Sequence, residues 1–303
     1  MNIKNKPTTG VLLTAYGSPE RLENVREFYT DIRAGRAPSE ELIHEIESRY
    51  RRVGGQTPLI RITRLQTEKV QEELERLRPG IYRVYMGMKH SQPKIKDTVQ
   101  QMMKDRITKI VALVLTPHYS VMSIGEYQRK LQKAMDDLDY HPELRFVESW
   151  HKNPHLITCI TEQLGKPKGI VVFTSHSLPV RILESGDPYR DQLFETSRLI
   201  AEKCGPSLKW ELAFQSAGRT DESWLGPDVK DILIKLAEGG LRQVTICPIG
   251  FVTDNLELLY DLDIVLFGQA EKLGVTLQRT PSRNTHPEFI KAIVTEVIHL
   301  ETK

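Results

Sequence analysis

Cysteine is scarce in this chain, and its three cysteines lie far apart. Cys159, Cys204 and Cys247 form no CxxC pair and no four-ligand cluster among the 303 residues. A disulfide framework, a structural zinc site and an iron–sulfur cluster all need closely grouped cysteines, so the sequence argues against each of them. An odd number of scattered cysteines is typical of a reducing compartment, and we expect a cytoplasmic protein.

Long apolar runs are also missing. One of the longest covers residues 110–115 and ends at Thr116 and Pro117. A membrane-spanning helix needs about 20 apolar residues. The N-terminal segment MNIKNKPTTG lacks the apolar core of a signal peptide. We therefore expect no transmembrane segment.

Neither sign of charge is in large excess. The chain has 42 lysines and arginines against 40 aspartates and glutamates, which gives a net charge of +2. A charge this small does not indicate a nucleic-acid partner. No GxGxxG or GxxxxGK[ST] segment follows an apolar run, so a nucleotide cofactor has no support. A GxSxG segment, which would indicate a serine nucleophile, is also absent.

Short apolar segments, by contrast, recur throughout the chain and alternate with helical patterns. The eight expected strands cover residues 10–15, 82–86, 109–116, 144–148, 169–174, 210–215, 243–249 and 276–279. Strands that alternate with helices predict an α/β fold with parallel sheets covered on both faces. At this length, two four-stranded halves fit better than one eight-stranded sheet, with a crossover near residues 150–168.

Several helix boundaries can also be predicted. A helix over residues 40–53 should begin after the N-cap Ser39 and end at Gly54-Gly55. A second helix, over residues 61–78, carries an apolar set that we expect on its buried side: Ile62, Leu65, Val70, Leu74 and Leu77. We expect first-turn prolines to open three further helices at Pro154, Pro227 and Pro287.

Two of the expected strands lead to polar side chains, most of them titratable. GIVVFTSHSLP (169–179) places His176 at a strand exit, and QVTICPIGFVTDNLELLYD (243–261) leads to Asp254, Asn255 and Glu257 before a helix. Ligands of open α/β sheets bind at this carboxyl edge, so a histidine and a carboxylate there form a plausible proton-handling pair. Position alone is equally compatible with a His176 that only caps a loop by hydrogen bonding.

Eight segments, in this order, resemble the ferrochelatase family. They are LLTAYGSPE (12–20), YTDIRAGRAP (29–38), RYRRVGGQTPL (49–59), TPHYS (116–120), SHSLP (175–179), GDPYRDQL (186–193), FQSAGRTDESWLGPDV (214–229) and GFVTDNLELLYDLD (250–263). Each is weak alone, but together they extend over nearly the whole chain. The resemblance is closest to the short enzymes of Gram-positive bacteria that insert iron into coproporphyrin III.

The resemblance implies a fold and its division into domains. We expect two similar Rossmann-like, chelatase-type domains, each a four-stranded parallel sheet flanked by helices, with the active-site cleft between them. The first domain should cover residues 1–150 and the second residues 151–285, which include His176 and Glu257. A C-terminal helix over residues 286–303 should pack back on the first domain.

The resemblance also implies an activity, the insertion of ferrous iron into coproporphyrin III to give coproheme in heme biosynthesis, which is a lyase reaction. Metallation removes two pyrrole N–H protons and delivers a divalent cation to the ring nitrogens. A neutral imidazole can act as base and as iron ligand, and a carboxylate can accept or relay protons. By resemblance His176 and Glu257 are these groups, and Tyr16 is an axial ligand to iron from the other face. Iron is the substrate.

Further residues follow from the four propionates of coproporphyrin, because arginine, lysine and hydroxyl groups recognise carboxylates. By resemblance the edges of the macrocycle or an outer metal site are contacted by Arg33, Arg49, Thr57 and Gln66, with further donors at Lys89, Ser123 and Tyr127. Ile32 and residues 61–65 should supply apolar surface for the ring. The alternative for each arginine is a solvated helix face, and we prefer it for Arg51, Arg52 and Arg64.

The sequence departs from the family pattern at two positions. Asn255 stands where the family usually has a histidine, two residues before the glutamate, and an amide cannot exchange a proton near neutral pH. We expect Asn255 instead to orient Glu257 or an ordered water. Asp261 is retained, but Val265, one turn later, cannot ligate, so an outer metal site is weakly supported.

Two alternatives stay open. One is a chelatase for protoporphyrin IX, or for another metal such as cobalt. The other is a carrier that binds a tetrapyrrole without metallating it, which would have no use for His176 facing Glu257. We expect a monomer whose partners, besides the porphyrin, are enzymes upstream and downstream in heme biosynthesis.

Overall fold

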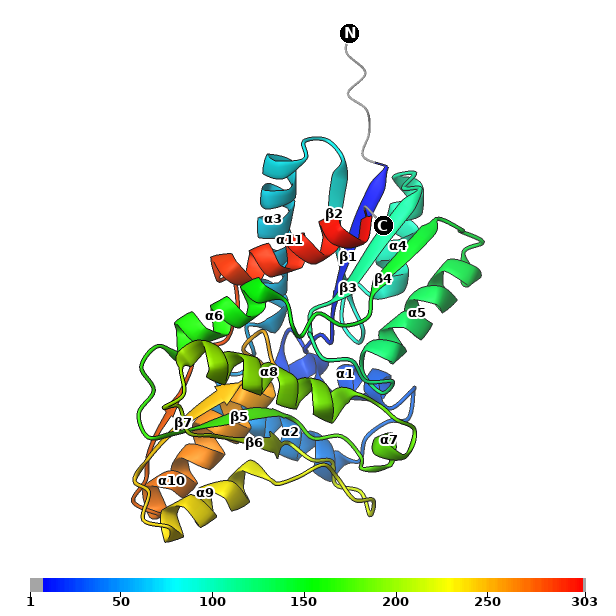
Figure 1. The fold of residues 1–303 in the computed structure, drawn as a ribbon. Coiled ribbons are helices and arrows are strands. Elements are labelled where there is room, and N and C mark those ends of the chain that lie inside the picture. Colours follow the sequence, from blue (N-terminus) through cyan, green and yellow to red (C-terminus); the bar gives the residue numbers. More distant parts are fainter. Residues whose placement is uncertain (1–7, 302–303) are drawn as a thin grey trace. The chain divides into compact units, whose positions relative to one another are not determined.

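The computed structural model describes residues 8–301 and forms two α/β units (Figure 1). Residues 1–7, which hold most of the N-terminal segment considered above, and residues 302–303 of the expected last helix lie outside the described residues. The first unit contains the described residues up to Pro117, Met122–Trp150 and the residues from Asn284 onward. The second contains His118–Val121 and His151–Arg283. Each unit has one four-stranded sheet, which confirms the predicted fold class.

The sheet of the first unit is parallel throughout, with strand order β2-β1-β3-β4. Its strands are β1 (Thr9–Ala15), β2 (Tyr82–Met88), β3 (Lys109–Val114) and β4 (Glu143–Val147). Its helices are η1 (Leu22–Asn24), α1 (Val25–Ile32), α2 (Glu40–Arg52), α3 (Leu59–Leu77), α4 (Ile95–Lys104), α5 (Ile124–Asp137) and α11 (Pro287–Glu301). Helices α3 and α11 pack together, as do α4 and α5. The central strands β1 and β3 are almost entirely buried, as expected for a parallel sheet with helices on both faces.

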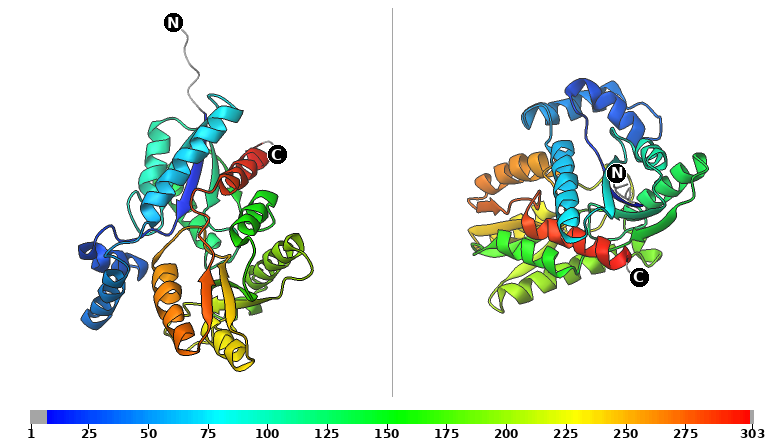
Figure 2. Two further views of the ribbon diagram at one scale, coloured as in Figure 1. Left: turned by 90° about the vertical axis from the view of Figure 1, so that its left-hand side faces the viewer. Right: turned by 90° about the horizontal axis from the view of Figure 1, so that it is seen from above.

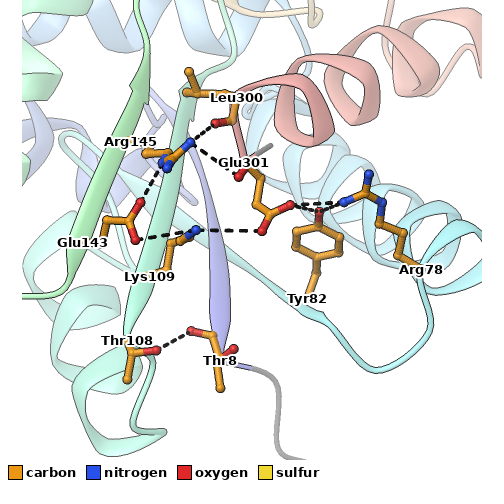
Figure 3. Close-up of polar contacts among 9 residues, drawn as sticks. All are labelled: Thr8, Arg78, Tyr82, Thr108, Lys109, Glu143, Arg145, Leu300 and Glu301. Carbon is orange, nitrogen blue, oxygen red and sulfur yellow. Dashed lines mark hydrogen bonds and ion pairs between the residues drawn. The ribbon is translucent and has the colours of Figure 1, made fainter. Parts of the chain in front are cut away.

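The last helix, α11, is fixed to the first unit by its C-terminal turn (Figure 3). The Glu301 carboxylate accepts hydrogen bonds from Arg78 Nη1 at 3.1 Å and from the Tyr82 hydroxyl at 3.2 Å. Arg145 Nη1 donates to the Leu300 carbonyl at 2.7 Å. A cation at this end also complements the helix dipole. These contacts hold a segment distant in sequence against β2 and β4.

The second unit repeats the arrangement, with parallel strands in the order β6-β5-β7-β8. Its strands are β5 (Ile170–His176), β6 (Trp210–Gln215), β7 (Gln243–Pro248) and β8 (Thr276–Arg279). Its helices are α6 (Pro154–Leu164), α7 (Arg181–Glu184), α8 (Tyr189–Cys204), α9 (Val229–Glu238), the π-helix η2 (Glu257–Leu266) and α10 (Phe267–Lys272). Helices η2 and α10 form one continuous orange element beside β8 in the left view of Figure 2.

The core of the second unit explains why η2 packs on the sheet. Leu258, Leu262 and Leu266 are fully buried and lie in one cluster with Val172 of β5 and Ile246 of β7. The wide turn of a π-helix keeps residues four apart on one face. The sheet therefore fixes the position of η2, and with it the position of Glu257, its first residue.

The predicted helix boundaries are largely confirmed. Ser39 caps α2, because its hydroxyl accepts a hydrogen bond from the Leu42 backbone N–H at 3.3 Å. Gly54 and Gly55 follow this helix with φ angles of +94° and +88°, which glycine adopts without strain. Pro154 and Pro287 open their helices as expected.

Two predictions on helices are wrong. On α3, Leu65 and Leu77 are exposed, because the buried line runs through positions 62, 66, 70 and 74 and therefore includes Gln66. Pro227 does not lie in the first turn of α9. Asp228 caps that helix by accepting from the Lys230 backbone N–H at 2.8 Å, which leaves the proline outside it. Within residues 8–301, no helix is long and apolar enough to cross a membrane.

Candidate active site

His176 and the segment that leads to Glu257 leave the second sheet at neighbouring strands. His176 is the last residue of β5, which lies between β6 and β7. From β5 the chain continues to β6 at one edge of the sheet, and from β7 it continues to β8 at the other edge. A reversal of strand order at the carboxyl edge is where open α/β sheets bind their ligands.

A close approach of backbone to β5 brings the segment after β7 to this edge. Ile249 donates its backbone N–H to the Thr174 carbonyl at 2.9 Å. A Cβ atom on Gly250 would lie 1.8 Å from Ser175 Oγ, so only glycine fits there. The segment after β7 therefore lies against the end of β5, next to His176, before η2 begins.

The hydrogen bond of the His176 ring defines which nitrogen is available for chemistry. Nδ1 contacts the Ser177 carbonyl, which can only accept, so Nδ1 carries the proton. The neutral ring then has its lone pair on Nε2. This atom lies 3.6 Å from Glu257 Oε1, and the two side chains are 36% and 37% exposed. A base with an accessible lone pair thus stands beside a carboxylate.

Glu257 is held in an environment that favours its protonated form. Burial raises the pKa of this carboxyl; the nearby His176 lowers it, Asp261 raises it further, and the net direction is upward. Its Oε2 atom is shielded from solvent and has no hydrogen-bond partner among residues 8–301. A carboxyl with a raised pKa beside an imidazole is suited to accepting and returning protons.

Tyr189 supports the backbone of His176, a role that the sequence did not reveal. Its hydroxyl donates to the His176 carbonyl at 2.9 Å and lies 2.6 Å from Ser175 Oγ. Burial raises the pKa of Tyr189, so this hydroxyl keeps its proton as a donor. The residue lies within GDPYRDQL, one of the segments that carry the family resemblance.

Asn255 acts on the helix that carries Glu257. Its side-chain Oδ1 accepts from the Leu258 backbone N–H at 3.0 Å, and its carbonyl accepts from Leu259 N–H at 3.0 Å. This is the geometry of a helix N-cap. Asn255 therefore orients Glu257 through the backbone of the helix, whereas the sequence suggested a direct contact with the carboxylate or a water.

The region of the suspected outer metal site has a structural contact of its own. Asp261 Oδ2 accepts from Ser216 Oγ at 2.5 Å, which links η2 to the residue after β6. In the part of the chain that the structure describes, no three His, Cys, Asp or Glu side chains are grouped to hold a metal ion. The candidate metal ligands at this strand exit are therefore His176 and Glu257.

In the first unit, the corresponding strand exit gathers aromatic rings around a cation. Tyr16 directly follows β1 and is 42% exposed. The Lys89 ammonium lies 5.5 Å from the centre of the Tyr16 ring and 5.3 Å from that of Tyr127, within range of cation–π attraction. Lys89 also forms an ion pair with Glu126. Three predicted site residues, Tyr16, Lys89 and Tyr127, thus lie together.

His90 is a further residue of this strand exit, which the sequence did not indicate. Its ring centre lies 4.7 Å from that of Tyr16, and its Nδ1 donates to Asp31 Oδ2 at 2.7 Å. Burial lowers the pKa of His90 to about 4, although the hydrogen bond to Asp31 opposes this. His90 is therefore neutral near pH 7 and orients the tyrosine ring edge-to-face.

The remaining predicted substrate-binding residues of the first unit differ in whether their side chains are already engaged in internal contacts. Arg49 pairs with Glu45 at 2.6 Å, the Thr57 hydroxyl lies 2.8 Å from Ser18 Oγ, and Gln66 is buried with its amide donating to the Asn284 carbonyl at 2.7 Å. The other three lie at helix ends with at least part of the residue accessible: Ile32, Arg33 and Ser123. Substrate contacts from Arg49, Thr57 or Gln66 would need these internal interactions to rearrange.

Comparison with known sequences assigns the chain to a family. The ferrochelatase family model matches residues 8–300. A ferrochelatase of Herpetosiphon aurantiacus is 40% identical, over 95% of this chain and 98% of that protein. The coproporphyrin III ferrochelatases of Anoxybacillus flavithermus and Bacillus subtilis are 39% and 36% identical, over 97% and 95% of this chain and 97% and 96% of theirs.

Comparison with solved structures agrees on the fold. SirB from Bacillus subtilis with Fe3+ matches with a TM-score of 0.62 at 11% identity, over 97% of this chain and 95% of that one. The sirohydrochlorin chelatase SirB from Bacillus subtilis subspecies spizizenii, in complex with cobalt, matches with a TM-score of 0.60, also at 11% identity, over 97% and 96%. At this identity the likeness concerns the chelatase-type fold only. The sequence matches go further: the chain belongs to the ferrochelatase family of metal-inserting enzymes.

Proposed function

We propose that this protein inserts ferrous iron into coproporphyrin III and releases coproheme, a lyase step of heme biosynthesis. The proposal rests on one observation above the others, the His176 Nε2 atom that stands 3.6 Å from Glu257 Oε1 at the carboxyl edge of the second sheet. The names of several relatives, coproporphyrin III ferrochelatase, support the choice of substrate.

The reaction exchanges two pyrrole protons for one ferrous ion, and His176 and Glu257 divide the proton transfers. His176 Nε2 accepts a pyrrole proton, since Nδ1 is occupied by its hydrogen bond to the Ser177 carbonyl. The resulting imidazolium is stabilised by the Glu257 carboxylate, which accepts or passes on a proton toward water. Before it takes up a proton, the same His176 lone pair can bind the incoming metal, because imidazole is a good ligand for ferrous iron.

The residues at the exit of β1 serve the macrocycle. The exposed Tyr16 phenol acts as a weak axial ligand to the iron, and His90 and Phe28 hold its ring edge-to-face at 4.7 and 6.3 Å. The Lys89 ammonium lies beside this ring and would bind a propionate in exchange for its ion pair with Glu126. Arg33, Ser123 and Tyr127 are further candidate donors, and Arg49, Thr57 and Gln66 remain candidates only after rearrangement.

Coproporphyrin should be preferred over protoporphyrin because of its two additional propionates. Each charge-assisted hydrogen bond to a preorganised donor contributes about 1.5–3 kcal/mol, and a vinyl group in the same place leaves the donor unpaired. We therefore expect a higher kcat/KM for coproporphyrin III than for protoporphyrin IX. The reaction needs neither an iron–sulfur cluster nor a nucleotide. We further propose that a cytoplasmic monomer exchanges substrate and product with neighbouring enzymes of the pathway.

An anaerobic assay with ferrous iron tests the proposal against both alternatives. The two porphyrins are mixed with iron and catalytic amounts of enzyme in parallel, and absorption bands of free and metallated ring are followed. Repeated turnover with faster insertion into coproporphyrin III supports the proposal. Equal or faster insertion into protoporphyrin IX would assign that substrate instead, and a stoichiometric shift without turnover would identify a tetrapyrrole carrier.

A further inference from the structure

One face of the second sheet changes from apolar to polar toward the active site. Because side chains alternate along a strand, Val172, Thr174 and His176 of β5 lie on the same face. Gln215, the last residue of β6, is the register partner of His176 and shares this face. Toward the start of the strands the face is apolar and includes Val172 and Ala213, whereas toward the exits it presents Thr174 and Gln215.

Helix η2 covers this face. Its leucines Leu258 and Leu262 lie in the same core cluster as Val172 and Ala213, so the helix packs on the apolar part of the face. Glu257, at the start of η2, reaches His176 at the strand exit. Thr174 and Gln215 are 0% and 1% exposed, which places them in the interior of the unit rather than at its surface.

Four polar side-chain atoms of this interior lack a hydrogen-bond partner among residues 8–301. Thr174 Oγ1, the Gln215 amide oxygen and nitrogen, and Glu257 Oε2 are all buried without a hydrogen bond to any residue of the described range. Buried polar side chains in native proteins are almost always hydrogen-bonded to protein or to ordered water. Thr174 and Gln215 lie at the exit end of this face, and Glu257 lies at the start of the helix that covers it, so their unpaired atoms indicate a common partner.

We propose that Thr174 and Gln215 hold one ordered water against the inner oxygen of Glu257 and thereby fix its carboxylate for the contact with His176. The donor and acceptor inventory of the four atoms matches one water molecule. The water accepts from the Thr174 hydroxyl and the Gln215 amide nitrogen, and it donates to the Gln215 amide oxygen and Glu257 Oε2. Thr174 and Gln215 are positioning residues on this account, because they act on the reaction through Glu257.

This inference rests on the proposed function, and its test uses pairs of substitutions that separate position from packing. Thr174→Val keeps the shape and removes the hydroxyl, whereas Thr174→Ser keeps the hydroxyl. The matched control is Thr245→Val, a buried threonine of β7 in the same sheet whose hydroxyl donates to the Lys168 carbonyl at 3.0 Å. Gln215→Met independently removes the amide group, which supplies two of the four atoms proposed to bind the water.

Iron insertion into coproporphyrin III is measured for each variant, with kcat and KM determined separately. Loss of one positioning hydrogen bond lowers kcat by about 10-fold. We expect this loss in Thr174→Val and Gln215→Met, with KM for the porphyrin unchanged, and recovery of kcat in Thr174→Ser. Thr245→Val should lower the unfolding temperature but leave kcat as in the wild type.

The outcomes distinguish the inference from the function on which it rests. A wild-type protein that inserts no iron contradicts the proposed function itself. A wild type that turns over, with Thr174→Val and Gln215→Met equal to it in kcat, overturns only the positioning role. That role is also overturned if Thr174→Ser is as slow as Thr174→Val, or if the loss appears in KM instead of kcat.

Discussion

The two units have the same strand order but carry different chemistry at the same edge. In each, the first strand is central, the second lies to one side of it, and the third and fourth to the other. The exit of β1 presents an exposed tyrosine beside a lysine, whereas the exit of β5 presents an imidazole beside a carboxylate with a raised pKa. A repeated scaffold thus supplies the position, and under the proposed function a few residues at the strand ends decide between holding a substrate and moving protons.

The largest loss of activity is expected for a substitution of His176. His176→Ala removes the imidazole at the exit of β5 and with it the proton acceptor, so insertion should fall by about 10²–10⁴-fold. Porphyrin binding, followed by fluorescence quenching, should stay close to that of the wild type because it depends on other residues. Turnover comparable to the wild type would show that His176 only caps its loop.

Lys89 tests the proposed role of the other strand exit, that of β1, in binding the substrate. Lys89→Met keeps the length of a side chain that is 8% exposed and removes the cation between Tyr16 and Tyr127. Loss of a charge-assisted contact worth about 1.5–3 kcal/mol should raise KM for coproporphyrin by roughly 10- to 100-fold, with kcat changed little.

The matched control for this lysine is Lys69→Met on α3, an exposed residue paired with Glu72 at 3.0 Å, which should change neither constant. A fall in kcat at unchanged KM in Lys89→Met would place the lysine in the chemical step and remove the division of labour between the two strand exits.

Gly250 determines how close the segment after β7 comes to β5, and a substitution there tests this close approach. Gly250→Ala places a methyl group 1.8 Å from Ser175 Oγ, so the loop must move away from His176. We expect a loss of about 1–3 kcal/mol in the free energy of unfolding, together with reduced kcat. Gly268→Ala on α10, where nothing lies within 4 Å of the added carbon, serves as the control and should be neutral or slightly stabilising. Wild-type kcat in Gly250→Ala would refute the close approach.

Asn255 should give the smallest effect. Asn255→Ala removes the N-cap of the helix that carries Glu257, which costs about 1 kcal/mol and should lower turnover by up to about 10-fold. Asn255→Asp retains the cap and should retain activity, and Asn255→His should be tolerated. If Asn255→Asp is as slow as Asn255→Ala, the amide acts in another way than through the helix.

The sequence was most informative where structure is local. Buried parallel strands form continuous apolar runs, so all eight strands and the exit position of His176 could be predicted. An asparagine three residues before Leu258 is compatible with a helix N-cap, but only the structure shows that Asn255 caps this helix and does not contact the Glu257 carboxylate directly. The burial of Gln66 in place of Leu65 could not be predicted, because both fit a helical stripe and only packing decides between them.

Contacts between residues of distant segments could not be predicted from the sequence for the same reason. Tyr189 reaches His176 from the start of α8, and His90 reaches Tyr16 from the segment after β2. Thr174 and Gln215 are neighbours only through the pairing of β5 with β6. Hydrogen bonds and register between segments far apart in sequence leave no periodic pattern in either segment.

A double-mutant cycle tests the central claim most directly, which is that His176 and Glu257 act as one unit. Single-turnover insertion of ferrous iron into coproporphyrin III is measured for the wild type, His176→Ala, Glu257→Gln and the double variant. If the pair acts together, the double variant is no slower than the slower single variant. Losses that multiply in the double variant, with porphyrin binding intact throughout, would contradict a shared proton pathway.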